Sequence, residues 1–198
     1  MINPRPKILD YVASLDYAVF EDGDWNLNII GVRKRHGEPN KYDDTIVVCY
    51  KKNGLWQEER FPVTTDPGLY WLNNPGRVEG TAILCPGQYR GAWRIGKHRG
   101  KYDALVQVKA VRVFRDSNKD NFFNMEPNTV REGLYGINIH RSGRGTTQNV
   151  NKYSAGCQVF SDFSDFNAFM YLCEKQIDER GWKNFTYTLL TEPENAGL

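Results

Sequence analysis

The chain has 198 residues, of which 40% are hydrophobic and 25% charged, and its formal net charge is +2. This length is enough to bury one sizeable core and favours one domain over two. The near balance of charges does not favour a nucleic-acid partner, although a small positive excess is compatible with an anionic polymer.

Two features bear on the compartment. The first ten residues contain Pro4, Pro6 and mixed charges but no apolar segment, so they do not resemble a secretory signal, and nowhere do about 18 apolar residues follow one another as in a transmembrane segment. The four cysteines lie far apart without a C-x-x-C pair, which fits neither a zinc knuckle nor a disulfide scaffold. We therefore expect free thiols, and a protein that is cytoplasmic as synthesised or is carried to its target by another system.

Short apolar segments separated by turn residues follow an N-terminal extension of residues 1–20. Many of these segments are rich in β-branched and aromatic residues, which predicts a β-rich domain. The turn Lys52-Asn53-Gly54 joins two of them as a hairpin. The predicted strands, in chain order, are 25–32, 45–50, 55–63, 69–72, 80–84, 104–114 and 134–140.

One amphipathic helix is predicted near the C-terminus. Apolar residues recur at spacings of three and four over 163–177, after a candidate N-cap at Ser161 or Asp162. Gly181 ends this helix, and 185–190 follows as the last strand. The predicted fold class is mainly β (α+β), in one domain spanning the whole chain, with one C-terminal helix and a final strand.

The segment 136–160 carries the clearest candidate chemistry. A short apolar strand ends at His140, a polar, glycine-rich loop follows, and Cys157 closes a Ser-x-Gly-Cys sequence. A thiol needs a nearby base to become a thiolate at neutral pH, and an imidazole with a pKa of about 6.5 is suited to take that proton. We therefore predict Cys157 as the nucleophile, with a lowered thiol pKa, and His140 as its base.

Two further residues of this segment are candidates for the site. Gly156 has no Cβ, so it can adopt a strained turn that leaves its backbone N–H, with that of Cys157, free to bind a carbonyl oxygen. Ser154 is a candidate to orient the imidazole through its hydroxyl or its backbone carbonyl. No Asp or Glu occurs from 133 to 160, so the segment contains no acidic third member.

This segment resembles the L,D-transpeptidase catalytic domain (YkuD-type), whose signature is a histidine followed by glycine, a loop, and Ser-x-Gly-Cys with a hydrophobic residue and an arginine. His140, Ser154, Gly156 and Cys157 match, and the resemblance covers about residues 60–160. It implies a mostly β sandwich or barrel and acyl transfer at a meso-diaminopimelate centre of peptidoglycan stem peptides, without metal or cofactor. The variant without a leader is similar to phage and prophage proteins, which implies delivery to the cell wall during lysis.

The chain departs from this signature at two positions. Arg141 stands where the family has glycine, and Val159 stands where it has arginine. Because valine cannot bind an anion, another cation must hold the substrate carboxylate, and we predict that Arg141 or Arg144 does so. His98 lies in a basic segment and is a further candidate for substrate binding; the alternative for all of these residues is a solvated loop position.

The remaining candidates are assigned no chemistry. Cys49, Cys85 and Cys173 fall on apolar segments, where core packing is expected. Residues 116–120 resemble the start of a calcium loop, but the required glycine is absent and Pro127 stands where the closing glutamate is needed.

Three functions are compatible with these residues. The first is a cysteine enzyme that acts on peptidoglycan stem peptides, with hydrolysis favoured over cross-linking. The second is an inactive cell-wall-binding or virion structural protein of the same fold, which the missing arginine favours. The third is a cysteine peptidase with a protein substrate. The oligomeric state stays open.

Overall fold

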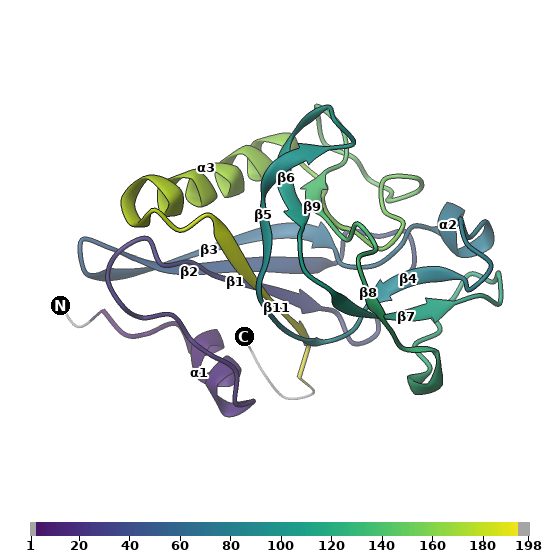
Figure 1. Ribbon diagram of the computed structural model, residues 1–198, viewed down its shortest axis with the longest axis horizontal. Coiled ribbons are helices and arrows are strands. Elements are labelled where there is room, and N and C mark those ends of the chain that lie inside the picture. The colour runs from purple at the N-terminus through teal and green to yellow at the C-terminus, as the bar shows by residue number, and fades with distance from the viewer. Residues whose placement is uncertain (1–2, 194–198) are drawn as a thin grey trace.

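The computed structural model describes residues 3–193, and the predicted domain of 1–198 extends beyond them at both ends. Within this part of the chain, strands close into a barrel, a small second sheet lies at one side, and a long helix runs along the barrel (Figure 1). The barrel strands are β1 (Asn28–Arg33), β2 (Asp44–Lys52), β3 (Leu55–Thr64), β5 (Gly87–His98), β6 (Tyr102–Gln107), β9 (Ile139–Arg141), β10 (Gln158–Phe160) and β11 (Asn184–Thr191). The small sheet contains β4 (Thr81–Leu84), β7 (Val111–Asp116) and β8 (Arg131–Gly133).

The barrel follows the order β1-β11-β5-β6-β9-β10-β3-β2. Two of its pairs are parallel, β1 with β11 and β9 with β10, and the others are antiparallel. The predicted hairpin is confirmed as β2 and β3, because Asn53 and Gly54 both adopt the positive φ angles, 53° and 74°, that a tight two-residue turn needs.

The predicted helix is confirmed as α3 (Phe163–Arg180). Asp162 is its N-cap and accepts hydrogen bonds from the backbone N–H groups of Ser164 and Asp165, and Gly181 ends it in the left-handed conformation with φ 69°. The buried face of α3 packs on the barrel, where Phe169 stacks against Phe160 of β10 with ring centroids 5.0 Å apart. The helix therefore covers the barrel next to the strand that follows Cys157.

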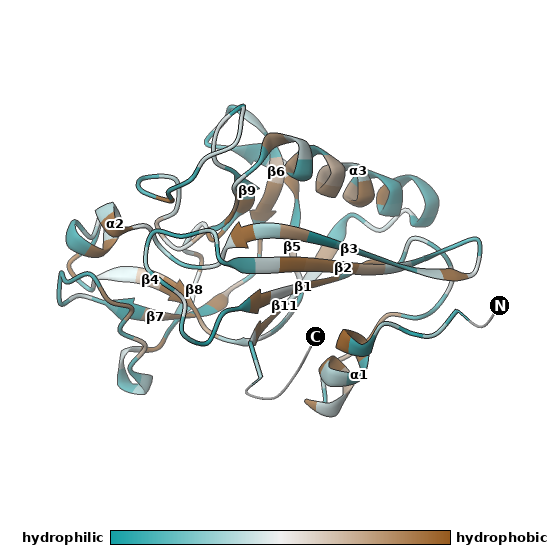
Figure 2. Cartoon of the chain, turned by 180° about the vertical axis from the view of Figure 1, so that it is seen from behind, coloured by the Kyte–Doolittle hydropathy of each residue, from teal (hydrophilic) through white to brown (hydrophobic). Residues whose placement is uncertain are grey.

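One apolar cluster joins the barrel, the small sheet and α3, and includes Trp93, Phe160 and Tyr187. A second cluster lies under α1 (Lys7–Ser14), where Ile8 and Leu9 pack against strands β1, β2 and β11. The extension of residues 1–20 thus contributes a helix to the barrel wall. Figure 2 shows the apolar residues concentrated on the strands and the polar residues in the loops.

Three predicted strands differ in the structure. Residues 69–72 form a short helix, α2 (Leu69–Asn73), because Gly68 caps its first turn and the Asn73 side chain bonds the Leu69 carbonyl. Segment 104–114 divides into β6 and β7, which belong to different sheets, and segment 134–140 is irregular except at β9.

Other elements lacked a clear sequence signal. These are α1, the 3₁₀ turn η1 (Pro127–Thr129), the glycine-containing strand β5, and the short strands β8 and β10. The coarse prediction of a mainly β chain with a C-terminal helix and a final strand is confirmed. No helix within residues 3–193 is long and apolar enough to cross a membrane.

Candidate active site

Two adjacent parallel strands bring His140 and Cys157 to the same face of the barrel wall. β9 carries His140 opposite Val159 of β10, and the Gln158 N–H donates to the Asn138 carbonyl at 2.9 Å just before Cys157. Side chains alternate between the faces of a strand, so Asn138, His140 and Cys157 all point to the face opposite Ile139. The register of the two strands therefore places the candidate base and the candidate nucleophile on one face.

The turn before Cys157 depends on a glycine. Gly156 has φ +113°, and a Cβ built there would lie 2.2 Å from the carbonyl oxygen of Ala82 in β4. This close approach of two backbones confirms the predicted strained turn. It also joins the loop of residues 142–157 between β9 and β10, which we call the nucleophile loop, to the small sheet.

Ser154 has a different role from the predicted one. Its buried hydroxyl donates to the Cys157 carbonyl at 2.8 Å and accepts from the Gly156 N–H at 3.1 Å, while its carbonyl accepts from the Gly68 N–H. The hydroxyl and carbonyl are thus both used within the loop, and neither contacts the imidazole. The same bonds occupy the Gly156 N–H, so the prediction that this group is free for an oxyanion is wrong for this conformation.

The Cys157 sulfur is held as a neutral thiol. The residue is partly exposed, and its Sγ donates to the Gly136 carbonyl at 3.3 Å. Burial of the sulfur raises the thiol pKa to about 11, while the Asn138 backbone N–H and the charge of Arg99 act in the opposite direction. The sequence predicted a lowered pKa; the structure differs because burial of the sulfur outweighs the Asn138 hydrogen bond and the charge of Arg99.

The His140 imidazole is buried and also neutral. Burial, followed by the neighbouring His98, lowers its pKa to about 3. Its Nδ1 lies 2.8 Å from the Arg141 carbonyl oxygen, which can only accept, so this nitrogen carries the proton. The tautomer leaves Nε2 with a lone pair, as a general base requires.

Tyr102 and the Arg141 backbone take the orienting role predicted for Ser154. The Tyr102 hydroxyl donates to the Arg141 carbonyl at 3.1 Å and lies 3.3 Å from His140 Nδ1. A backbone carbonyl thus holds the imidazole in one tautomer in place of a carboxylate. The sequence could not reveal Tyr102, because it comes from the distant strand β6.

His98 is part of this site rather than a solvated loop residue. It ends β5, is 7% exposed, and stacks on the His140 ring with centroids 3.9 Å apart. The Asn138 amide donates to its Nδ1 at 3.1 Å, and burial lowers its pKa to about 4. The neutral ring packs against the candidate base, and its role in substrate binding stays a prediction.

The structure brings Arg141 and Arg144 together at one pocket beside α3. Arg141 follows His140 on the strand, so its side chain points to the opposite face, where its guanidinium lies over the rings of Tyr102 and Phe163 at 4.1 and 5.1 Å. Arg144 lines the same pocket of about 490 Å³ beside α3. Their role in substrate binding stays a prediction.

Arg99 is a cation whose charge acts on both Cys157 and His140. It lies in the hairpin after His98, is exposed, and lowers the pKa of Cys157, His98 and His140 alike. Among residues 3–193 it forms no hydrogen bond or ion pair, so its guanidinium is available to a ligand. The sequence indicated it only as a basic neighbour of His98.

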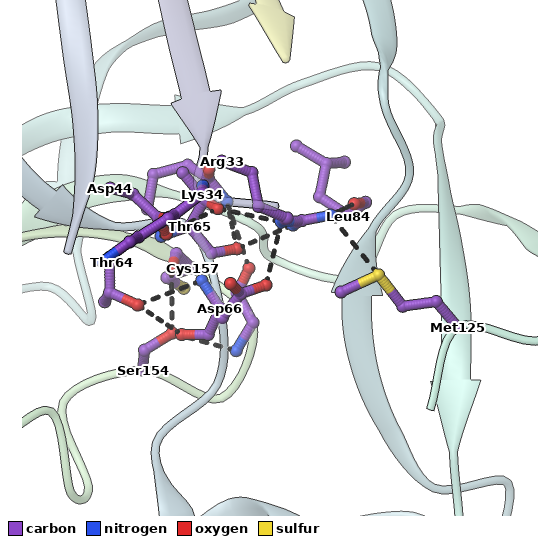
Figure 3. Close-up of polar contacts among 12 residues, drawn as sticks. Arg33, Lys34, Asp44, Thr64, Thr65, Asp66, Leu84, Met125, Ser154 and Cys157 are labelled. Carbon is purple, nitrogen blue, oxygen red and sulfur yellow. Dashed lines mark hydrogen bonds and ion pairs between the residues drawn. The ribbon is translucent and has the colours of Figure 1, made fainter. Parts of the chain in front are cut away.

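A buried polar cluster lies beside the nucleophile loop, and Figure 3 shows it with Ser154 and Cys157. Arg33 Nε lies 3.0 Å from Asp66 Oδ1 and donates to Thr65 Oγ1, whose residue is also bonded to Asp44. Burial raises the pKa of Asp66 to about 7, although Arg33 opposes this shift. This cluster could not be predicted from the sequence, because Arg33 opens a basic run typical of a solvated turn.

The other candidates carry no chemistry in the structure. Cys49, Cys85 and Cys173 are buried, which confirms core packing for all three. No group of three or more His, Cys, Asp or Glu side chains within the described part of the chain is arranged to hold a metal ion.

Comparison with known proteins adds no assignment: no family model matches the chain, and no curated protein or solved structure is similar enough to count as a match.

Proposed function

We propose that this protein is a cysteine-dependent acyl-transfer enzyme of the L,D-transpeptidase type that acts on peptidoglycan stem peptides. The observation that carries the proposal is the pairing of β9 with β10, which presents the Cys157 thiol and the unprotonated Nε2 of His140 on one face. The Ser-x-Gly-Cys sequence and the upstream histidine supply the family and hence the substrate class.

The proposed reaction begins from two neutral groups. Substrate binding turns the thiol from the Gly136 carbonyl toward His140, the S–H proton passes to Nε2, and the sulfur attacks the peptide carbonyl carbon. The tetrahedral intermediate collapses as His140 returns the proton to the leaving amine, which leaves a thioester on Cys157. Water then hydrolyses the thioester, and we favour this outcome over attack by a second amine.

The loop geometry limits how the oxyanion is stabilised. Because the Gly156 N–H is bonded to Ser154, the Cys157 N–H is the remaining donor of the turn. Cations around the site would add to the stabilisation of the oxyanion. Of these, Arg99 has the strongest support, because its charge already acts on Cys157.

The test is digestion of purified peptidoglycan, followed by mass spectrometry of the released peptides. Cys157→Ala should abolish cleavage, and His140→Ala should lower its rate by roughly 10² to 10⁴. Cys173→Ala is the matched control, since that thiol lies in the core. Cleavage by Cys157→Ala at the wild-type rate would exclude the proposal.

A binding protein with the same fold is the second candidate. It is favoured by the neutral thiol, the raised pKa of Cys157 and the missing family arginine. It predicts that wild-type protein binds stem peptides without changing their mass over long incubation.

A further inference from the structure

A small cleft opens beside the nucleophile loop, between α2 and the sheet of β4 and β7, whose positions can be followed in Figure 1. Its volume is about 210 Å³, below the range of about 300 to 1,000 Å³ that is common for whole-ligand pockets. It therefore suits one group of a larger substrate. Its lining includes two arginines, two aromatic residues and Ala155, and no carboxylate.

The cleft adjoins Cys157 through short structural links. Arg115 of β7 pairs with Ala82 of β4, and the Ala82 carbonyl is the group that approaches Gly156. On the other side, Tyr135 precedes Gly136, whose carbonyl accepts from the Cys157 sulfur. A peptide that acylates Cys157 would thus have a neighbouring group within reach of the cleft.

Arg115 is the unusual residue of this cleft. It is only 8% exposed, donates to the Gly80 carbonyl and lies over the Tyr135 ring at 5.6 Å. Among residues 3–193, no carboxylate lies within ion-pair distance of its guanidinium; burial lowers its pKa, and the charge of Glu79 acts in the opposite direction. A guanidinium removed from water with only this longer-range compensation is unfavourable, and a bound carboxylate would reduce that cost through a bidentate contact.

A second cation and an aromatic wall complete the cleft. Arg77 is exposed at its edge and adds positive charge. Trp71 of α2 is fixed by a hydrogen bond from its Nε1 to the Lys152 carbonyl at 3.1 Å, so the wall is joined to the loop that leads to Cys157. The lining thus offers charge for an anion and apolar surface for the carbon chain that bears it.

We propose that this cleft is a carboxylate subsite, in which Arg115 and Arg77 bind a carboxylate of the peptide that acylates Cys157. The assignment rests on the proposed function and adds a binding site to it. It places substrate recognition on the small sheet, separate from the pocket of Arg141 and Arg144 beside α3. The subsite selects acyl donors that carry a free carboxylate near the scissile carbonyl.

The experiment measures binding without turnover. Isothermal titration calorimetry of Cys157→Ala protein, the reference protein, with a diaminopimelate-containing tetrapeptide gives the reference Kd. A second titration measures the Kd of the same peptide with its carboxylates converted to carboxamides. Adding Arg115→Gln should weaken binding of the acidic peptide by roughly ten- to a hundredfold, and Arg77→Ala by a smaller factor. Arg94→Ala, which removes an exposed arginine of β5 that does not line the cleft, is the matched control and should bind like the reference.

The amide arm identifies the group that is recognised. The carboxamide peptide should bind the reference protein as weakly as the acidic peptide binds Arg115→Gln, and that variant should no longer distinguish the two peptides. Gln keeps a donor for the Gly80 carbonyl, and thermal unfolding checks that the fold is retained. Arg77→Ala removes an exposed side chain, so its effect does not depend on folding.

Two results would overturn the subsite: no binding of the acidic peptide by the reference protein, or binding of the acidic peptide by Arg115→Gln with the affinity of the reference protein. The function is tested separately with wild-type protein. Arginine-dependent binding without turnover by wild-type protein would support the subsite and contradict the enzyme. Turnover with arginine-independent binding would support the enzyme and contradict the subsite.

Discussion

The two reacting side chains are both uncharged in the free protein, which determines how each should respond to pH. The pKa of Cys157 is raised to about 11 and that of His140 is lowered to about 3, in both cases mainly by burial. Between these two pKa values the Cys157 thiol keeps its proton, and the His140 imidazole carries a single proton and is neutral. The site therefore depends on proton transfer during attack rather than on a preformed thiolate and imidazolium pair.

A prediction at the scale of single residues concerns Arg99. Because its charge lowers the pKa of Cys157, Arg99→Ala should raise that pKa further and slow alkylation by iodoacetamide at a fixed alkaline pH. The measurement is the alkylation rate of Cys157 from pH 7 to 10, followed by peptide mapping. Lys97→Ala, in the same hairpin but paired with Asp103, is the control and should leave the rate unchanged. An identical profile for Arg99→Ala would mean that its charge does not act on the sulfur.

The predicted role of Arg141 and Arg144 in substrate binding can be tested by steady-state kinetics. If Arg141 or Arg144 binds the substrate carboxylate, removing it should lower kcat/KM for a tetrapeptide by roughly ten- to a hundredfold. The position of Arg141 on the opposite face from His140 favours a smaller effect from it than from Arg99. Full activity of Arg141→Ala, Arg144→Ala and the double variant would exclude both residues from this role.

At the scale of elements, the turn between the nucleophile loop and β10 depends most on Gly156. Gly156→Ala places a Cβ 2.2 Å from the Ala82 carbonyl at φ +113°, so the loop and β4 must separate. We expect a loss of about 1 to 3 kcal/mol in the free energy of unfolding, measured in urea. Gly145→Ala in the same loop is the control, because nothing lies within 4 Å of its Cβ position. Equal stabilities of the two variants would contradict the strained contact.

The elements differ in how far the sequence predicted them, for physical reasons. α3 and the β2–β3 hairpin have local signals, a cap at Asp162, an end at Gly181 and the Asn53-Gly54 turn, and each lies where these residues indicate. α2 was predicted as a strand because its five residues are too few for helical periodicity. β9 and β10 are stabilised by pairing with distant segments, which leaves no local pattern.

The candidate site divides in the same way. The sequence indicates Cys157, His140 and Gly156 as candidates because they lie in one segment with a recognisable spacing. Tyr102 was missed, and Ser154 was given the wrong contacts, because the hydrogen bonds of the imidazole come from a strand and a backbone carbonyl that only the closed barrel brings together.

At the scale of the whole molecule, the buried cluster of Arg33, Asp44 and Asp66 links the barrel to the nucleophile loop and makes stability depend on pH. The pKa of Asp66 is raised from 3.8 to about 7, so the folded protein binds its proton more tightly than the unfolded chain does. The resulting stabilisation is complete below the unfolded pKa and is lost as the pH rises through about 7.

The corresponding prediction concerns Asp66→Asn, which keeps the shape without the ionisation. The wild-type Tm should fall between pH 5 and 8 by more than the Tm of this variant does, as measured by circular dichroism. Asp103→Asn is the control, since that carboxylate is 52% exposed and should leave the pH dependence of Tm as in the wild type. Parallel curves for the wild type and Asp66→Asn would contradict the assigned direction.

The covalent intermediate tests the central proposal most directly. Wild-type protein is mixed with excess diaminopimelate-containing tetrapeptide, quenched in acid within the first turnovers, and analysed by intact mass and by peptide mapping. We predict an adduct equal to the peptide minus its leaving amine, located on Cys157, cleaved by hydroxylamine, and absent from Cys157→Ala. Product formation by Cys157→Ala, or an adduct on another residue, would contradict the account.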